Sequence, residues 1–380
     1  MHVKTCLVLD VSLVTGCYIS ADQILLQRSI SDRTNTPGDI LRLFHQENQW
    51  QMSITKHVIA YMPSKYGYQH AFRATAATIE FLLTASFSFF TLQSKGKMAE
   101  FTIDDQKLEA LKGKVVIVTG GSSGIGLSTV DLLLSLGASV VSGDVQPPPG
   151  EYKGSFTFVK TDVSVWGDLI ALFKKAKEVY GRIDHVFANA GVGPRTDYLA
   201  TEVDENGDLK EPSHQLLDIS LKGVINTSTL AINYLRQQPE GGSILISGST
   251  TGLQRVRAVD YSTAKHGVLG WGRGLVPLLA AAQLPIRVNT LAPSWTDSSV
   301  LPSLKALLDA INVELQPASV VARCAAFLMA DSSKNGQLVH IERGKYAEID
   351  EAVLLPTFGK IKSDDYPWED DVLDRLSKLG

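Results

Sequence analysis

KVVIVTGGSSGIG, residues 114–126, joins an apolar run to a glycine-rich turn and decides the fold class. The short apolar run Lys114–Thr119 predicts a buried strand. The next segment, Gly124–Leu136, carries apolar residues at helical spacing and stops at Gly137, as a helix with a C-terminal glycine does. At such a turn the backbone can approach a pyrophosphate, whose charge the helix N-terminus attracts. The stretch therefore predicts the first strand and helix of a dinucleotide-binding domain.

Short apolar runs continue to alternate with longer amphipathic stretches down the chain. Further strands are predicted at residues 138–142, 157–160, 185–188, 243–247 and 286–291, with helices between them. This alternation is typical of βαβ units. We therefore expect an α/β fold: a Rossmann-type doubly wound parallel sheet with helices on both faces, forming a single catalytic domain.

The glycine turn and one carboxylate predict the cofactor. Gly120, Gly124 and Gly126 lie between the strand and the helix, and Asp144 closes the second strand at a distance suited to the adenosine ribose hydroxyls. A carboxylate there repels the 2'-phosphate of NADP, and residues 145–147 supply no arginine or lysine. We expect NAD in preference to NADP. The alternative is that Asp144 is a solvated carboxylate at a strand end.

A tyrosine and a lysine four residues apart predict the chemistry. Tyr261 and Lys265 occur in the run DYSTAKHG, and in a helix this spacing puts both side chains on one face. There the ammonium can depress the pKa of the phenol. A free tyrosine titrates near pH 10, so work near neutrality requires roughly 4 kcal/mol of differential stabilisation of the phenolate. Such a tyrosine can act as a general acid and base.

Composition limits the class of protein. The chain has 380 residues, of which 44% are hydrophobic and 20% charged, as expected for one large domain with extensions. The net charge of -4 argues against nucleic acid as a partner, because phosphate contact needs a basic surface. The cysteines are too few and too scattered for a disulfide framework or a zinc site (Cys6, Cys17 and Cys324). We expect no metal and a reducing, cytoplasmic location.

The first 97 residues differ from the rest in their mixed polarity and lack of a clear period. The stretch Cys6–Cys17 is interrupted by an aspartate and lacks a convincing cleavage site, which argues against a signal peptide. The uncharged run Phe81–Leu92 is shorter than the roughly 20 residues that cross a bilayer, which disfavours membrane association and leaves a peripheral anchor open. Residues 1–97 are therefore predicted to be a loosely ordered extension, or to precede a true start at Met98.

Two further segments complete the predicted organisation. Residues 98–345 are expected to form the dinucleotide-binding domain, and residues 346–380 a C-terminal extension that serves as a lid or an interface helix. In that extension three apolar residues could line one face of a closing helix (Val372, Leu376 and Leu379).

In combination these motifs resemble the short-chain dehydrogenase/reductase family, over residues 111–339. The resemblance is carried by TGGSSGIG, the Asp162-Val163 pair, the NAG of Asn189–Gly191 and YSTAK. It implies that Asp162 and Val163 border the adenine ring, and that Lys265 binds the nicotinamide ribose. The cofactor residues implied are Gly120, Ser122, Ser123, Gly124, Ile125, Gly126, Asp144, Asp162, Val163, Asn189, Ala190, Gly191, Tyr261, Lys265, Pro293 and Thr296.

The same resemblance assigns a catalytic serine. Ser247 and Ser249 both lie near the end of the fifth predicted strand, in GGSILISGSTTGL. Aligned from Gly242 on one side and from Gly252 on the other, the family pattern falls on Ser249 both times. Ser249 is thus expected to hold the substrate oxygen near the tyrosine.

Two positions depart from the family pattern. Ser220, in DISLKG, stands where the family usually has an asparagine that helps to hold a water in the proton relay. Serine has one hydroxyl in place of an amide's separate donor and acceptor, so activity could survive at a reduced rate. Ser294 stands where glycine is usual. The Ser220 change supports an alternative: a weak or inactive dinucleotide-binding scaffold or sensor.

The substrate is poorly encoded. The polar segment 192–212 and the apolar segment 295–313 are expected to form the walls and lid of a cleft that favours an apolar alcohol or ketone. DENGDLKEP and KNGQLV resemble a fungal branch near NAD-dependent 15-hydroxyprostaglandin dehydrogenases, which often serves secondary metabolism. The family resemblance also implies a homodimer or homotetramer.

Overall fold

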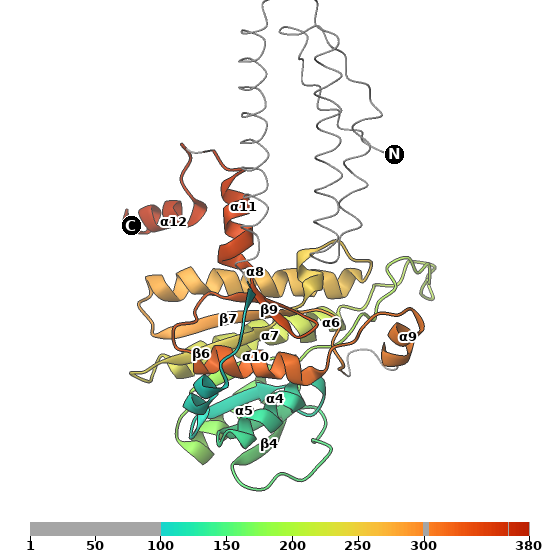
Figure 1. Cartoon of the computed structure of the whole chain (residues 1–380). Coiled ribbons are helices and arrows are strands. Elements are labelled where there is room, and N and C mark those ends of the chain that lie inside the picture. Colours follow the sequence, from blue (N-terminus) through green and yellow to red (C-terminus); the bar gives the residue numbers. More distant parts are fainter. Residues whose placement is uncertain (1–99, 299–303, 364, 380) are drawn as a thin grey trace, which may run out of the picture. The chain divides into compact units, whose positions relative to one another are not determined.

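The computed structural model describes residues 100–298, 304–363 and 365–379. Within these residues nine strands form one sheet, in the order β1-β9-β8-β7-β6-β5-β2-β3-β4 (Figure 1). The strands are β1 (Glu100–Phe101), β2 (Val115–Thr119), β3 (Ser139–Asp144), β4 (Phe156–Lys160), β5 (His185–Ala188), β6 (Gly242–Ser247), β7 (Ile286–Pro293), β8 (Leu338–Glu342) and β9 (Lys345–Glu348). All neighbours from β4 to β8 pair in parallel, and β9 and β1 add antiparallel strands at one edge. The predicted doubly wound parallel sheet is confirmed.

Helices connect most of the parallel strands. The α-helices are α4 (Gly124–Ser135), α5 (Trp166–Tyr180), α6 (Gln215–Leu217), α7 (Gly223–Leu235), α8 (Val259–Ala281), α9 (Leu304–Ala310), α10 (Ala318–Ala330), α11 (Leu355–Gly359) and α12 (Glu369–Ser377). Other helical segments are the 3-10 helices η2 (Asp105–Leu111) and η4 (Thr250–Leu253) and the π-helices η3 (Asp218–Lys222) and η5 (Asp350–Leu354). The first predicted helix matches α4 and is followed by Gly137 at a φ of 79°.

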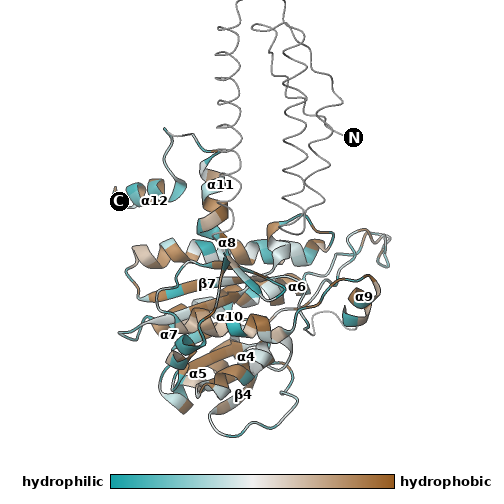
Figure 2. Ribbon diagram, viewed as in Figure 1, coloured by the Kyte–Doolittle hydropathy of each residue, from teal (hydrophilic) through white to brown (hydrophobic). Residues whose placement is uncertain are grey.

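The hydrophobic core lies on both faces of the sheet, because successive side chains of a strand point to opposite faces. Val116 and Val118 of β2 join a cluster with the buried sides of α4 and α10. Ile117, between them, joins a second cluster with α5, α7 and α8. Figure 2 shows the inner strands and α10 mostly in the hydrophobic colour. A strand that is apolar at every position is therefore explained by burial on both sides.

Three strands at one edge were not predicted. β8 and β9 form a hairpin in which Glu342 pairs with Lys345, so the loop consists of Arg343 and Gly344 alone. Both loop residues have a positive φ, of 49° and 74°, as a two-residue turn of type I′ requires. The predicted boundary at residue 346 falls inside β9, where Tyr346 is buried.

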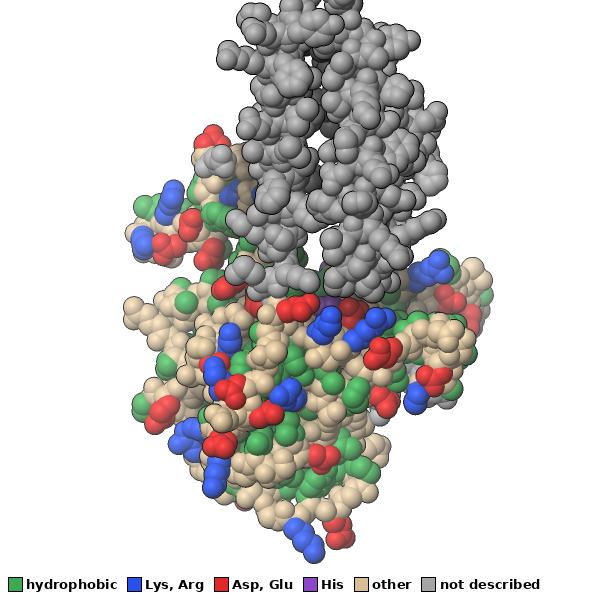
Figure 3. Space-filling model, viewed as in Figure 1, with side chains coloured by type: hydrophobic (Ala, Val, Ile, Leu, Met, Phe, Trp, Pro, Cys, Tyr) green, Lys and Arg blue, Asp and Glu red, His purple; other side chains and the backbone are tan. Residues whose placement is uncertain are grey.

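The C-terminal segment differs in part from its prediction. A helix forms at Glu369–Ser377, but it ends before Leu379, and Leu376 and Leu379 are 56% and 84% exposed. These side chains therefore do not form a buried face with the described residues. Residues 1–97, including Phe81–Leu92, lie outside the described residues. Of the helices described, none has the length and apolar character to cross a bilayer. On the face shown in Figure 3, basic and acidic side chains are interspersed.

Candidate active site

The strand order reverses between β2 and β5, and this places the candidate site. In a doubly wound sheet, ligands bind at the carboxyl ends of the strands where the order reverses. The glycine turn follows β2, and Asn189–Gly191 follows β5, so the topology brings these two predicted segments to the same crevice.

The glycine turn packs so closely that side chains cannot be added to it. Gly120 has a φ of 69°, and a Cβ there would lie 2.8 Å from the Cα of Ala190. A Cβ on Gly126 would overlap the carbonyl oxygen of Gly120. Gly124, the first residue of α4, has a φ of 51°. A helix N-terminus behind a glycine cradle fits a pyrophosphate, so these residues are suited to the dinucleotide that the sequence predicts.

Thr119, the last residue of β2, joins the two segments and was missed by sequence reasoning. Its Oγ1 accepts hydrogen bonds from the backbone N–H groups of Asn189 (3.1 Å) and Ala190 (3.2 Å). In return, the Asn189 amide donates to the Thr119 carbonyl oxygen at 3.0 Å. A threonine at a strand end carries no sequence signal that distinguishes this role.

Asp144 ends β3, the neighbour of β2, and its carboxylate faces the glycine turn. The backbone N–H of Ser122 donates to Oδ2 at 3.0 Å, and that of Gln146 donates to Oδ1 at 3.2 Å. The Ser122 hydroxyl donates to the Gln146 carbonyl oxygen at 2.7 Å. Ser123 precedes α4 without a side-chain cap, and Ile125 lies in its first turn. The carboxylate is thus held in place beside the turn.

Asp162 and Val163 follow β4 at the next position along the sheet. Oδ1 of Asp162 accepts from the backbone N–H and the hydroxyl of Ser164, at 2.9 and 2.6 Å. Val163 is buried and packs on Gly223, where an added Cβ would lie 2.7 Å from Cγ2 of the valine. In this structure the Asp162 side chain therefore shapes its own turn. Its predicted contact with adenine stays a prediction.

Tyr261 and Lys265 lie one turn apart on α8, as their spacing predicts. The Lys265 ammonium lies 5.6 Å from the centroid of the Tyr261 ring and donates to the Ser247 carbonyl oxygen at 2.7 Å. The Ser249 hydroxyl lies close enough to the Tyr261 phenol to lower its pKa. Ser249 also caps η4 by accepting from the N–H of Thr251 at 3.2 Å. The structure thus brings Ser249, rather than the Ser247 side chain, to the phenol.

The surroundings of Tyr261 and Lys265 within the protein shift both pKa values. Burial raises the pKa of Tyr261 above its usual value, and the nearby Ser249 hydroxyl opposes that rise. Burial also lowers the pKa of Lys265 to about 8. Loss of solvent disfavours both charged forms, and here it outweighs the effect expected of the neighbouring ammonium on the phenol.

Ser220 lies in the π-helix η3 and is fully buried. Its Oγ accepts from the backbone N–H of Val192 at 3.0 Å. A Cβ on Gly191 would lie 3.4 Å from this Oγ and 3.8 Å from the Lys265 Nζ, so all three residues meet at one point. π-helical turns occur often at functional sites. The role of Ser220 in a proton relay stays a prediction.

Pro293 ends β7, and Thr296 is buried just beyond it. The Thr296 hydroxyl donates to the Ser294 carbonyl oxygen at 2.8 Å and accepts from Nε2 of Gln316 at 3.0 Å. Gln316, which sequence reasoning missed, also donates to the Ile341 carbonyl oxygen at 3.1 Å. It connects the segment after β7 to β8. Only the fold reveals this link, because the partners are far apart in sequence.

In the part of the chain that the structure describes, no cluster of three or more histidine, cysteine or acidic side chains could hold a metal ion.

The chain matches known proteins over this same region. The family model described as short chain dehydrogenase matches residues 114–309. The short-chain dehydrogenase/reductase ascJ of Acremonium egyptiacum is 53% identical over 268 residues, which are 70% of this chain and 90% of that protein. The short-chain dehydrogenase/reductase prx4 of Penicillium roqueforti is 36% identical over 210 residues, 55% of this chain and 62% of that protein.

Solved structures with a similar fold include reductases of the same kind of architecture. The 3-ketoacyl-(acyl-carrier-protein) reductase from Brucella melitensis, complexed with NADH, is 25% identical with a TM-score of 0.53; the match covers 61% of this chain and 97% of that one. Levodione reductase, at 23% identity and a TM-score of 0.52, has the same fold. Together with the sheet topology and the matched family model, these findings mean that the chain belongs to the short-chain dehydrogenase/reductase family of NAD(P)-dependent oxidoreductases.

Proposed function

We propose that this protein transfers a hydride between NAD and a secondary alcohol or ketone on a mostly apolar small molecule. The observation that carries the proposal is the partly buried Tyr261 phenol, which lies near the Ser249 hydroxyl and one helical turn from the Lys265 ammonium. Such a group can exchange a proton with a substrate oxygen, which is what reduction of a ketone or oxidation of an alcohol requires.

Each of the three side chains has a part in this chemistry. Tyr261 moves the proton, and the Ser249 hydroxyl holds the substrate oxygen within reach of the phenol. Lys265, protonated below its pKa of about 8, supplies positive charge that favours the phenolate. A bound nicotinamide would supply or accept the hydride, and its oxidised form would add a second positive charge. Partial burial of the phenol then serves function, because a charge shielded from water interacts more strongly with its neighbours.

NAD is proposed in preference to NADP because of Asp144. Its carboxylate is fixed by two backbone N–H groups beside the glycine turn, where it suits ribose hydroxyls and repels a 2'-phosphate. The predicted resemblance to NAD-dependent 15-hydroxyprostaglandin dehydrogenases points the same way.

A role in secondary metabolism, action in the cytoplasm and a homodimeric or homotetrameric state complete the proposal. The match to fungal proteins such as ascJ of Acremonium egyptiacum supports the first. The apolar character of the substrate is supported by exposed apolar side chains on the segments assigned to the cleft, Leu199 at 89% and Trp295 at 51% exposure.

A weak or inactive dinucleotide-binding sensor is the second candidate. It is favoured by one contact: the Ser220 hydroxyl is occupied by the backbone of Val192, so it is less free to hold a relay water than an asparagine would be. The retained Tyr261, Ser249 and Lys265 favour the enzyme.

One experiment separates these candidates. The full chain is titrated with NADH and NADPH by thermal shift, then assayed on a panel of cyclic ketones and secondary alcohols. The enzyme predicts turnover that Tyr261→Phe lowers by about 100-fold or more, with NADH affinity nearly unchanged. Tyr180→Phe, at the C-terminal end of α5, is the matched control. Equal turnover by wild type and Tyr261→Phe would refute the proposed role of Tyr261, and NADH binding without turnover would favour the sensor.

A further inference from the structure

Asp260, the residue directly before Tyr261, is a buried carboxylate that the proposed chemistry does not use. It lies in the first turn of α8 and is 3% exposed. A buried carboxylate is costly unless hydrogen bonds satisfy it. Its partners therefore indicate why an acidic residue occupies this position.

Three backbone N–H groups donate to this carboxylate. Oδ1 accepts from the N–H of Tyr261 at 2.8 Å. Oδ2 accepts from the N–H of Arg195 at 3.1 Å and from that of Thr196 at 3.3 Å. One oxygen is thus bonded to α8, the helix that carries Tyr261, and the other to a segment 64 and 65 residues earlier in the chain. The positive end of the helix dipole adds to the stabilisation of this charge.

The segment that Asp260 holds is the root of the loop assigned to the substrate wall. At its start, the N–H of Val192 donates to the Ser220 hydroxyl at 3.0 Å. Beyond residue 196, every residue from 197 to 215 is exposed. The outer loop has one local bridge, between Val203 and Leu209. Residues 192–196 are therefore the part of the predicted substrate wall that is fixed to α8.

We propose that Asp260 is a positioning residue that fixes residues 192–196 against the start of α8 and so sets the distance between the substrate wall and the Tyr261 phenol. This inference rests on the proposed function of that site. The carboxylate is required, rather than any polar side chain, because both of its oxygens accept. An asparagine would turn its NH₂ group toward one of the two sets of N–H donors and lose that set.

Hydrogen–deuterium exchange tests the anchor without any substrate. In the full chain, exchange at Arg195 and Thr196 is expected to rise at least tenfold in Asp260→Ala, with NADH affinity within twofold of wild type. Asp260→Asn should lie between the two. Arg195→Ala is the matched control, because it removes the side chain and its bond to Gln215 but keeps the backbone N–H that Asp260 accepts. Its exchange should match wild type. Unchanged exchange in Asp260→Ala would overturn the anchor.

Kinetics then test positioning against a purely structural role. On the best ketone of the panel, Asp260→Ala is expected to raise KM about tenfold while kcat falls less than threefold. Arg195→Pro removes the backbone N–H that makes the shorter of the two hydrogen bonds to Asp260 Oδ2, so it should raise KM in the same way. The double variant should add nothing to the effect of Asp260→Ala, because that change already breaks the same contact. Equal losses in kcat and thermal stability with KM unchanged would overturn the proposal. The exchange experiment also separates its failure from that of the proposed function, because it needs no turnover.

Discussion

The Lys265 ammonium donates a hydrogen bond of 2.7 Å to the backbone carbonyl oxygen of Ser247 and so ties α8 to the end of β6. The lysine is buried, with a pKa lowered to about 8 by loss of solvent. It bonds to the residue two positions before Ser249 and lies one helical turn from Tyr261, which suits it to catalysis, while its burial makes the ammonium destabilising to the fold.

Lys265→Met is expected to raise the free energy of unfolding at pH 7 and to abolish turnover. The folded pKa of about 8 lies below the usual 10.5, a difference that corresponds to about 3 kcal/mol. Losing the bond to Ser247 offsets part of this, which leaves a net gain of about 1 kcal/mol. The buried ammonium lowers the free energy of unfolding by its full amount below pH 8, and by less as the pH rises toward 10.5. The stability that Lys265→Met gains should therefore shrink by pH 10. Urea unfolding at both pH values checks this, and a less stable variant at pH 7 would contradict it.

Gly126→Ala is expected to abolish NADH binding and to destabilise the protein by about 2 kcal/mol or more, because the new Cβ would overlap the Gly120 carbonyl oxygen. Gly274→Ala is the control: it is also helical, with nothing within 4 Å of the added Cβ. That change should preserve binding and stabilise α8 by up to about 1 kcal/mol. Calorimetric titration with NADH and thermal unfolding measure both effects. Normal binding by Gly126→Ala would mean that the turn does not cradle the cofactor.

Asp144→Asn is expected to reduce the preference for NADH over NADPH by about tenfold or more, since removing a repelling charge worth about 1.4 kcal/mol changes affinity by that factor. Fluorescence titration with each cofactor gives the ratio. Asp131→Asn, an exposed aspartate on α4 that accepts from the Tyr152 hydroxyl, should leave it unchanged. A wild-type protein that prefers NADPH would refute the assigned role of Asp144.

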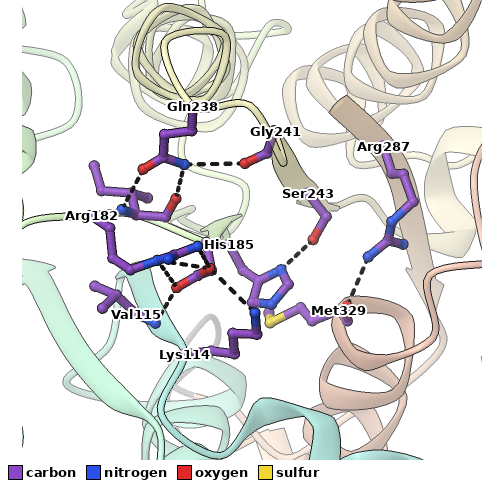
Figure 4. Close-up of polar contacts among 11 residues, drawn as sticks. Lys114, Val115, Arg182, His185, Gln238, Gly241, Ser243, Arg287 and Met329 are labelled. Atoms are coloured by element: carbon purple, nitrogen blue, oxygen red, sulfur yellow. Dashed lines mark hydrogen bonds and ion pairs between the residues drawn. The ribbon is translucent and has the colours of Figure 1, made fainter. Parts of the chain in front are cut away.

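His185 predicts loss of stability in acid. Figure 4 shows its ring beside Ser243, whose hydroxyl lies 2.7 Å from Nδ1, within a polar cluster that includes Arg182 and Gln238. Burial lowers the pKa of His185 to about 3. Because the folded pKa is depressed, the unfolded chain binds more protons below pH 6.5, and stability falls as the pH drops from there toward 3. Between pH 7 and pH 5, this group alone should lower the free energy of unfolding by about 2 kcal/mol.

The variant His185→Gln isolates that contribution, because it keeps a polar partner for Ser243 and does not titrate. Its urea-unfolding free energy should change less between pH 7 and pH 5 than that of wild type. His214→Gln, at a half-exposed position, is the control and should behave as wild type does. Identical pH slopes in His185→Gln and wild type would contradict the prediction.

Much of the fold could be predicted from local pattern. The strands β2 to β7 fall within two residues of their predicted bounds, because each is a short apolar run between turns. The hairpin of β8 and β9 was missed, since its strands are short and its turn, Arg343-Gly344, has only two residues. β1, at two residues, is too short to give a pattern and exists only through its pairing with β9.

The sequence by itself determined the glycine turn and the placement of Tyr261 and Lys265 on one helix face, because both depend on residues within one or two turns of each other. Only the tertiary structure decided the protonation behaviour of that pair, since burial depends on the whole packed domain and here raises the phenol's pKa. It alone also revealed that Asp260 holds Arg195 and Thr196, and that Gln316 holds Thr296. Contacts between distant parts of the chain form only when the strands and helices pack together. No local sequence pattern can therefore encode them.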